Sequence, residues 1–285
     1  MESRNPVIAR MEKEAERGGG YAGFGTATAT ATATAPAGVG TEPVALPQQA
    51  EPVGRPMTVN DVVVRTAAMF VPLLITAYLA WTMQVSGLVV MVAALGAFGL
   101  AMWGILSKKP RPLVSLAYAA LEGVVLGGIS FWLQEYVDAS NLARGQEKTT
   151  NIVALAVMGT LAAFAAVLFL YATRIIKVTN TFKKMMMIAM VAYLGIAIVS
   201  VFFAIFAGTG DGFGFYGAGW LGLLLCAAGV ALASFSLALD FDAIEKSVQY
   251  GLPEQESWRL ALGLTVTLVW LYLEILRFLA ILNSR

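Results

Sequence analysis

Acidic residues lie within or directly after apolar stretches in the C-terminal part of the chain. Asp240, Asp242 and Glu245 close one such stretch, and Glu274 lies inside the last one. A charged side chain costs roughly 2.5 to 3.5 kcal/mol at the centre of a membrane-spanning helix, so a carboxylate there needs a compensating role. The pattern predicts a site that handles protons or cations.

Glu274 is the strongest candidate, because predominantly apolar residues precede it from Leu264 and others follow it. Exposure to lipid would be costly, so its side chain is expected to face the interior of a helix bundle. A structural ion pair with Arg277, three residues later on the same helix face, is the alternative interpretation. A second carboxyl group beside Glu274 in a poorly solvated site would share a proton with it, and the pair would change charge near physiological pH.

The three acidic residues after the preceding stretch differ in how far the helical pattern carries them. That pattern continues through Ile244 and Val248, which places the Asp240 carboxylate inside the bundle. For Asp242 and Glu245, a water-exposed helix end is an equally good interpretation. Asp240 is therefore a primary candidate, and Asp242 and Glu245 are secondary ones.

Glu122 lies about ten residues into an earlier apolar stretch, which is about 15 Å at the 1.5 Å rise of a helix. A short acidic side chain cannot reach water from that depth. It is either a neutral, hydrogen-bonded acid that joins two helices or a group that lines a polar path. Gly123, Gly127 and Gly128 allow a neighbouring helix to approach closely, which is more often a packing feature than a pore.

The composition indicates an integral membrane protein. Of the 285 residues, 58% are hydrophobic and 13% are charged, whereas about 25% are charged in an ordinary soluble domain. The net charge of +1 gives no argument for a nucleic-acid partner. With no histidine and one cysteine, Cys226, the chain has no Ser-His or Cys-His catalytic site, histidine-bound metal or thiolate zinc site. We therefore expect neither an enzyme nor a cofactor.

The chain divides into two parts by composition. Residues 1–56 are rich in glycine, proline and alternating threonine and alanine. Such a segment buries too little apolar surface to offset the entropy of ordering it, so a disordered cytoplasmic tail without a signal peptide is predicted. Residues 57–285 form the predicted transmembrane domain.

Seven apolar stretches are long enough to cross a bilayer, which takes about 20 helical residues. Hydrocarbon offers no partners for unpaired backbone groups, and no stretch alternates like a barrel strand. An all-α polytopic membrane protein with seven transmembrane helices is therefore predicted. The expected spans are 62–83, 87–106, 113–135, 151–172, 186–207, 219–240 and 259–282.

Basic residues in the short connections predict the orientation. The second and fourth connections are rich in lysine and arginine, whereas the first and fifth have neither. Basic connections favour the cytoplasmic side, which places the N-terminus inside and Arg285 outside. Arg65 lies just inside the first span near the cytoplasmic interface, where it can extend toward water or pair with an inner-end carboxylate.

Three motifs fall on the third, sixth and seventh spans. They are Leu121-Glu122-Gly123 with Leu126-Gly127, Leu239-Asp240-Phe241-Asp242-Ala243-Ile244-Glu245, and Leu271-Tyr272-Leu273-Glu274-Ile275-Leu276. In this order, on seven short-looped spans, they resemble the Bax inhibitor-1 (transmembrane Bax inhibitor motif) family, in its bacterial branch. The resemblance covers roughly residues 57–285.

The resemblance implies a central last helix wrapped by the other six, which form two triple-helix layers. It also implies a pH-sensitive calcium leak gated by two aspartates, which by motif fall on Asp240 and Glu274. Glutamate thus replaces the second aspartate, and the stretch between the two acids is longer than usual. The family's arginine latch has no equivalent inside the second span, so Arg65 or Arg111 takes its place or the latch is absent.

Two functions from different classes follow. The first is an ion channel or leak for calcium or another cation, with a candidate calcium site near Asp240 and Glu274, because calcium prefers oxygen ligands. The second is a non-conducting regulator that binds another membrane protein, such as a protease or stress factor. Deleting residues 1–56 tests the second, through loss of a co-purifying partner. A proton-coupled carrier also fits intramembrane carboxylates. The expected location is the bacterial inner membrane.

Overall fold

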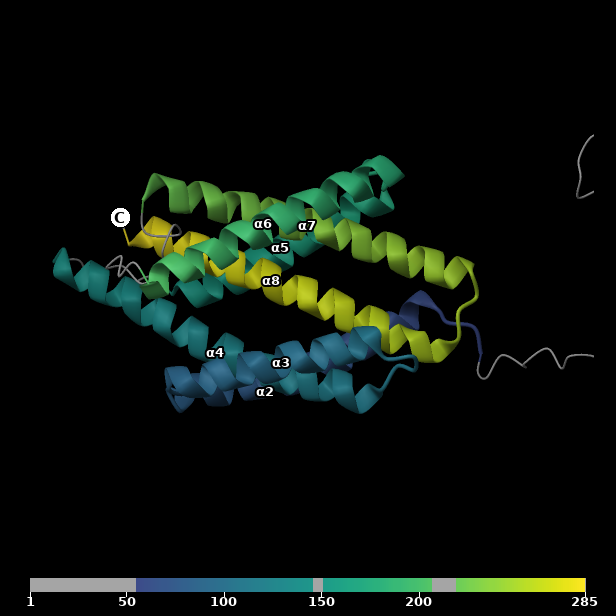
Figure 1. Cartoon of the computed structure of the whole chain (residues 1–285), viewed down its shortest axis with the longest axis horizontal. Helices are drawn as coiled ribbons and strands as arrows, with labels where there is room; N and C mark the ends of the chain where they lie inside the picture. Colours follow the sequence, from purple (N-terminus) through teal and green to yellow (C-terminus); the bar gives the residue numbers. More distant parts are fainter. Residues whose placement is uncertain (1–54, 146–150, 207–218, 285) are drawn as a thin grey trace, which may run out of the picture. The chain divides into compact units, whose positions relative to one another are not determined.

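The computed structural model describes residues 55–145, 151–206 and 219–284. Within them, seven long α-helices follow one another, all long and apolar enough to cross a membrane, as the predicted all-α fold requires (Figure 1). A 3₁₀ turn, η2 (Glu254–Glu256), precedes the last helix. The helices are α2 (Val59–Thr82), α3 (Gly87–Leu106), α4 (Pro112–Ala143), α5 (Ile152–Ala172), α6 (Asn180–Phe206), α7 (Trp220–Gln249) and α8 (Ser257–Asn283).

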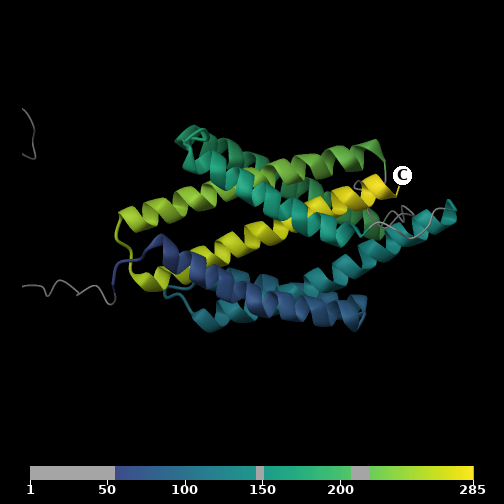
Figure 2. The same cartoon turned by 180° about the vertical axis from the view of Figure 1, so that it is seen from behind.

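The helices form two groups on either side of α8. Figure 1 shows α2, α3 and α4 on one side and α5, α6 and α7 on the other, and Figure 2 shows the same division from behind. Helix α8 packs against α2, α3, α4, α5 and α7. The last helix is therefore central to the bundle, with three helices in each flanking layer, as the resemblance implied.

Burial separates the inner helices from the outer ones. In the most apolar stretch of each helix, 56% of α4 and 50% of α8 is buried, but only 11% of α6. The core around α8 contains fully buried leucines such as Leu237, Leu262 and Leu271. Large apolar side chains remain exposed along α2, α3 and α6, as expected for helices whose outer faces meet lipid.

Local sequence signals explain two of the helix ends. At the start of α2, the Thr58 hydroxyl accepts a hydrogen bond from the Asp61 amide, and the Asp61 carboxylate accepts one from the Thr58 amide at 2.8 Å. This reciprocal pair is a capping box. At the end of α7, Gly251 has a φ of 64°, which lets the Leu252 amide reach back to the Ser247 carbonyl. The chain reverses there, so α7 and α8 run side by side in opposite directions.

Three helices extend well beyond the predicted spans. Helix α4 continues to Ala143 and α7 to Gln249, and α6 begins at Asn180, ahead of the span predicted at 186–207. Polar side chains one turn apart support such extensions, as between Gln134 and Asp138, whose side chains are hydrogen-bonded at 3.1 Å. The extension of α7 places Asp240 within the helix and not at its end, as the continuing helical pattern predicted.

A short segment before α2 binds the turn between α7 and α8. Pro56 and Pro253 form an antiparallel β-bridge, and the Met57 amide donates a hydrogen bond to the Leu252 carbonyl at 2.8 Å. We call residues 55–58 the strap, and the end of the bundle that carries it the strap end. The predicted disordered tail lies outside the described residues except for its last two, which belong to the strap.

Candidate functional site

Glu274 is buried on the central helix, with its side chain 5% exposed. Its Oε1 atom accepts a hydrogen bond from the Trp270 indole at 3.2 Å and lies 3.8 Å from the Arg277 guanidinium. Its Oε2 atom has no hydrogen-bond partner among the described residues. The ion pair with Arg277 that the sequence suggested is therefore present, but it is long and leaves one carboxylate oxygen unsatisfied.

Helices α6 and α7 complete the surroundings of Glu274. A Cβ atom at Gly229 of α7 would lie 2.7 Å from Glu274 Oε2 and would also overlap the Tyr193 hydroxyl of α6. A residue with a side chain at this position would displace one of these polar groups. Gly229 thus lets the carboxylate of α8 and the hydroxyl of α6 meet at the backbone of α7.

A groove between α6, α7 and α8 leads to Glu274. It has a volume of about 740 Å³ and is lined largely by apolar side chains, including Met187, Val191 and Leu194 of α6 and Leu239 of α7. The same three residues of α6 are exposed, so the groove opens on the side of the bundle. The polar groups of its lining are those of Lys183, Tyr193, Trp270, Glu274 and Arg277.

Asp240 occupies a different level of the bundle. Its carboxylate interacts with the Thr267 hydroxyl of α8, and its buried Oδ2 atom has no hydrogen-bond partner within the described ranges. Thr267 and Glu274 are about 10 Å apart along the helix axis, at 1.5 Å per residue. The two carboxylates thus have different neighbours on α8, and the structure does not bring them together as a hydrogen-bonded pair.

Glu122 is half-buried on α4. The glycines that follow it serve helix packing: a Cβ atom at Gly123 or Gly127 would collide with carbonyl oxygens of α2, and one at Gly128 with a valine of α3. These glycines allow α4 to pack closely against both helices. No hydrogen bond or ion pair in the described part of the chain links Glu122 to the carboxylates of α7 and α8.

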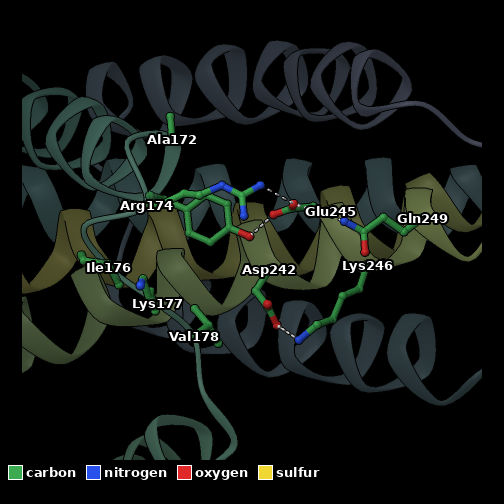
Figure 3. A pocket seen from close by; sticks show the side chains of 10 residues that line it. Ala172, Arg174, Ile176, Lys177, Val178, Asp242, Glu245, Lys246 and Gln249 are labelled. Atoms are coloured by element: carbon green, nitrogen blue, oxygen red, sulfur yellow. Dashed lines mark hydrogen bonds and ion pairs between the residues drawn. The ribbon is translucent and has the colours of Figure 1, made fainter.

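Asp242 and Glu245 lie in the last turns of α7, where both have partners. The Asp242 carboxylate is buried and lies 2.6 Å from Lys183 Nζ and 2.7 Å from Lys246 Nζ. Glu245 accepts a hydrogen bond from the Tyr171 hydroxyl at 2.5 Å (Figure 3). These contacts agree with the interpretation of both residues as charges near a helix end, and the charge of Asp242 is neutralised by two lysines.

Arg65 binds the α7–α8 turn. Its guanidinium lies 2.6 Å from the Glu254 carboxylate and 5.4 Å from the centre of the Trp258 ring. Arg55 of the strap lies 3.0 Å from the same carboxylate and 2.5 Å from that of Asp61. The hydrogen bond to Asp61 raises the pKa of Arg55, so this arginine stays charged at physiological pH. Of the two roles suggested for Arg65, pairing with a carboxylate is the one observed, and its partner is Glu254.

Neither of the two arginines considered for a latch, Arg65 or Arg111, pairs with Asp240 or Glu274 among the described residues. Arg65 is occupied by the α7–α8 turn, and Arg111 lies over the Trp103 ring at 5.3 Å. The arginine beside an acid of the central helix is Arg277, which comes from α8 itself. Because Arg277 and Glu274 belong to the same helix, their ion pair does not itself join two helices.

The carboxylates are not arranged as a resident metal site. Among the described residues, no group of three Cys, Asp or Glu side chains comes together in a way that could hold a metal ion. Calcium takes about six to eight oxygen ligands, so a calcium ion at Glu274 would take most of them from water.

Three residues of the site escaped the sequence analysis: Gly229, Tyr193 and Trp270. Glycine and aromatic residues are common in membrane helices, so their types carry little information. Trp270 precedes Glu274 by one helical turn, and that spacing was the available signal. Nothing in the sequence indicated that α6 and α7 contribute Tyr193 and Gly229 to the same point.

Seven membrane-length helices, with a buried carboxylate on the central one, define a multi-pass membrane protein. The sequence model of the family described as Bax inhibitor 1 like matches residues 5–284, and the chain belongs to this family. No curated protein matches the sequence. Membership confirms the resemblance drawn from the motifs of the third, sixth and seventh spans.

Proposed function

We propose that this protein is a pH-sensitive cation leak, with calcium as the ion and with Glu274 and Asp240 as carboxylates on its path. The observation that carries the proposal is the Glu274 carboxylate, which is buried, has one oxygen without a hydrogen bond from the described residues, and lines a groove of about 740 Å³. A buried acid of this kind is costly in purely structural terms, which favours a functional role.

The depths of the two carboxylates support a path along α8. Asp240 lies about 14 Å from the end of α7 at Gln249, and Glu274 about 14 Å from the end of α8 at Asn283, at 1.5 Å per residue. Because α7 and α8 run in opposite directions, these are opposite ends of the bundle. A cation that moves along α8 would meet the two carboxylates in succession.

The charges around Glu274 support sensitivity to pH. Its titratable neighbours are Arg277 on α8, Tyr193 on α6 and Cys226 on α7, whose thiol interacts with Arg277; Lys183 lines the same groove. When Glu274 is ionised, its charge balances that of Arg277 and attracts cations. When Glu274 is protonated, the groove loses this negative charge while Arg277 keeps its positive one, so the electrostatic barrier to a passing cation changes.

Calcium flux into calcium-free liposomes tests the proposal, measured with an enclosed dye between about pH 6 and about pH 8. Glu274→Gln and Asp240→Asn each remove a charge with little change in volume. Each substitution is expected to lower the flux at least several-fold, and Glu274→Gln is expected to abolish its dependence on pH.

Asp138→Asn is the matched control. Asp138 is a buried acid of α4 that accepts a hydrogen bond from Gln134 and does not line the groove. This variant is expected to retain the wild-type flux and pH dependence. A wild-type flux no greater than that of protein-free vesicles, or equal fluxes in all the variants, would overturn the proposal.

A further inference from the structure

A second pocket lies at the strap end, separate from the groove at Glu274. It has a volume of about 430 Å³ and is bounded by the end of α5, the α5–α6 connection and the last turns of α7 (Figure 3). Helix α5 is apolar up to Ala172, and the basic connection begins just beyond it. In a bilayer this boundary lies at the level of the lipid headgroups.

The two acidic residues of the pocket already have partners. Asp242 is shared between Lys183 at 2.6 Å and Lys246 at 2.7 Å. Glu245 accepts a short hydrogen bond from the Tyr171 hydroxyl. Figure 3 shows the Asp242 carboxylate directed toward Lys246, and the Glu245 carboxylate directed toward the Tyr171 hydroxyl and Arg174. The charge of Asp242 is therefore compensated within the protein, whereas Glu245 is hydrogen-bonded by a neutral hydroxyl and has Arg174 as a more distant cation.

Positive charge is in excess around the pocket. Four cations, those of Arg174, Lys177, Lys183 and Lys246, accompany two carboxylates. The Arg174 side chain is 84% exposed, and its guanidinium is 4.0 Å from Glu245, at the outer limit of an ion pair. Lys177 is exposed and forms no ion pair within the described part of the chain. Two positive charges are thus left to attract an anion.

The backbone places Arg174 beside α7. Its φ of 58° lies in the left-handed region, which residues other than glycine rarely adopt. The turn is closed by a hydrogen bond of 2.9 Å from the Arg174 amide to the Tyr171 carbonyl. Glycine would suit this helix end better but would supply no guanidinium. A residue with an unfavourable backbone conformation for this turn, Arg174, thus supplies a positive charge to the pocket.

The geometry points to a site for the phosphate-bearing headgroup of an anionic membrane lipid. A guanidinium binds two phosphate oxygens at once, and lysines add point charges. Zwitterionic lipids carry a cationic group that the surplus positive charge would repel, whereas phosphatidylglycerol has none. Ile176 and Val178 also line the pocket and offer apolar contact to the glycerol and the start of the acyl chains.

Lipid retention by the full-length protein tests this site. The protein is reconstituted in bilayers of phosphatidylcholine and phosphatidylglycerol. After the protein is released from the bilayer, the lipids that remain bound to it are counted by native mass spectrometry. The wild type is expected to prefer phosphatidylglycerol. Arg174→Gln combined with Lys177→Gln is expected to weaken its retention about tenfold or more, because each substitution removes a charge-assisted contact to the phosphate.

Lys108→Gln combined with Lys109→Gln is the matched control, because it removes the same charge from the α3–α4 connection at the same end of the bundle. This control is expected to retain lipid as the wild type does. Equal retention by the two double variants would overturn the proposal. In the wild type, insensitivity of retention to salt, or displacement of the lipid by inorganic phosphate, would also overturn it, the latter by indicating a site for free phosphate.

Discussion

Gly229 decides whether Glu274 can occupy its position. The Glu274 carboxylate and the Tyr193 hydroxyl both reach the point where a Cβ atom of residue 229 would lie. The position of the buried carboxylate therefore depends on Gly229 of α7, a residue without a functional group. Side chains around such a carboxylate are packed as closely as in any protein interior, so one added methyl group changes the stability of the fold.

Gly229→Ala is expected to lower the free energy of unfolding by about 1 to 3 kcal/mol, because the new methyl group overlaps the Tyr193 hydroxyl and the Glu274 carboxylate and forces them away from α7. It should also lower the calcium flux, since the Glu274 carboxylate must shift. Thermal unfolding in detergent and the liposome assay measure the two effects.

Gly195→Ala on α6 provides the comparison, because a Cβ atom there meets open space. This change is expected to leave stability unchanged or to raise it by up to about 1 kcal/mol, since alanine is the better helix former. Equal stability of the two alanine variants would show that the space at Gly229 is not restricted.

The sequence could identify the acids of this site but not their partners. Glu274 and Asp240 stand out because a carboxylate in an apolar stretch is rare and costly. Tyr193 and Gly229 are ordinary residues of membrane helices, and their meeting depends on how α6 and α7 are rotated about their axes. That rotation follows from tertiary packing, which cannot be read from a single sequence. For the same reason, the separation of Asp240 from Glu274 emerged from the structure.

At the scale of elements, the strap and the α7–α8 turn form one polar junction. Arg65 of α2 and Arg55 of the strap share the Glu254 carboxylate. The Arg65 side chain is 14% exposed, against 56% for Arg55. An ion pair removed from water is screened less, so the contact of Arg65 should contribute more to stability.

A double-mutant cycle with Arg65→Gln and Glu254→Gln is expected to give a coupling energy of about 1 kcal/mol or more in the free energy of unfolding. The parallel cycle with Arg55→Gln is expected to give a smaller value, because Arg55 is largely exposed. A larger coupling for Arg55 would contradict the assignment of Arg65 as the main contact between α2 and the turn.

Helix positions followed from hydropathy much better than helix ends did. The span predicted at 87–106 coincides with α3, because apolar residues fill it and polar ones flank it. Helices α4 and α7 continue past their apolar stretches, since polar side chains one turn apart support them, as Asp242 and Lys246 do in α7. Hydropathy measures the apolar thickness of a span and not the length of its helix.

At the scale of the whole molecule, the distribution of basic residues predicts that the strap end faces the cytoplasm. Lys108, Lys109 and Arg111 lie in the α3–α4 connection at the strap end, and the α2–α3 connection at the opposite end has no basic residue. Such an asymmetry retains the basic connections on the cytoplasmic side during membrane insertion.

Thiol labelling in intact bacterial cells checks this orientation in a background that carries Cys226→Ala and so lacks cysteine. Ser86→Cys in the α2–α3 connection is expected to react with a membrane-impermeant maleimide. Lys109→Cys is expected to react only after the membrane is permeabilised. Both positions are exposed, so accessibility within the protein does not bias the comparison. The reverse pattern would invert the predicted topology.

The β-bridge between Pro56 and Pro253 gives the strap a mechanical consequence. The segment before residue 55 is joined through this bridge and the Met57–Leu252 hydrogen bond to the chain just ahead of α8. Tension applied to that segment would load the bridge and the start of α8 together with α2, without first passing through the outer helices. A force applied to the chain at the strap would thus be transmitted directly to α8, the helix that carries Glu274.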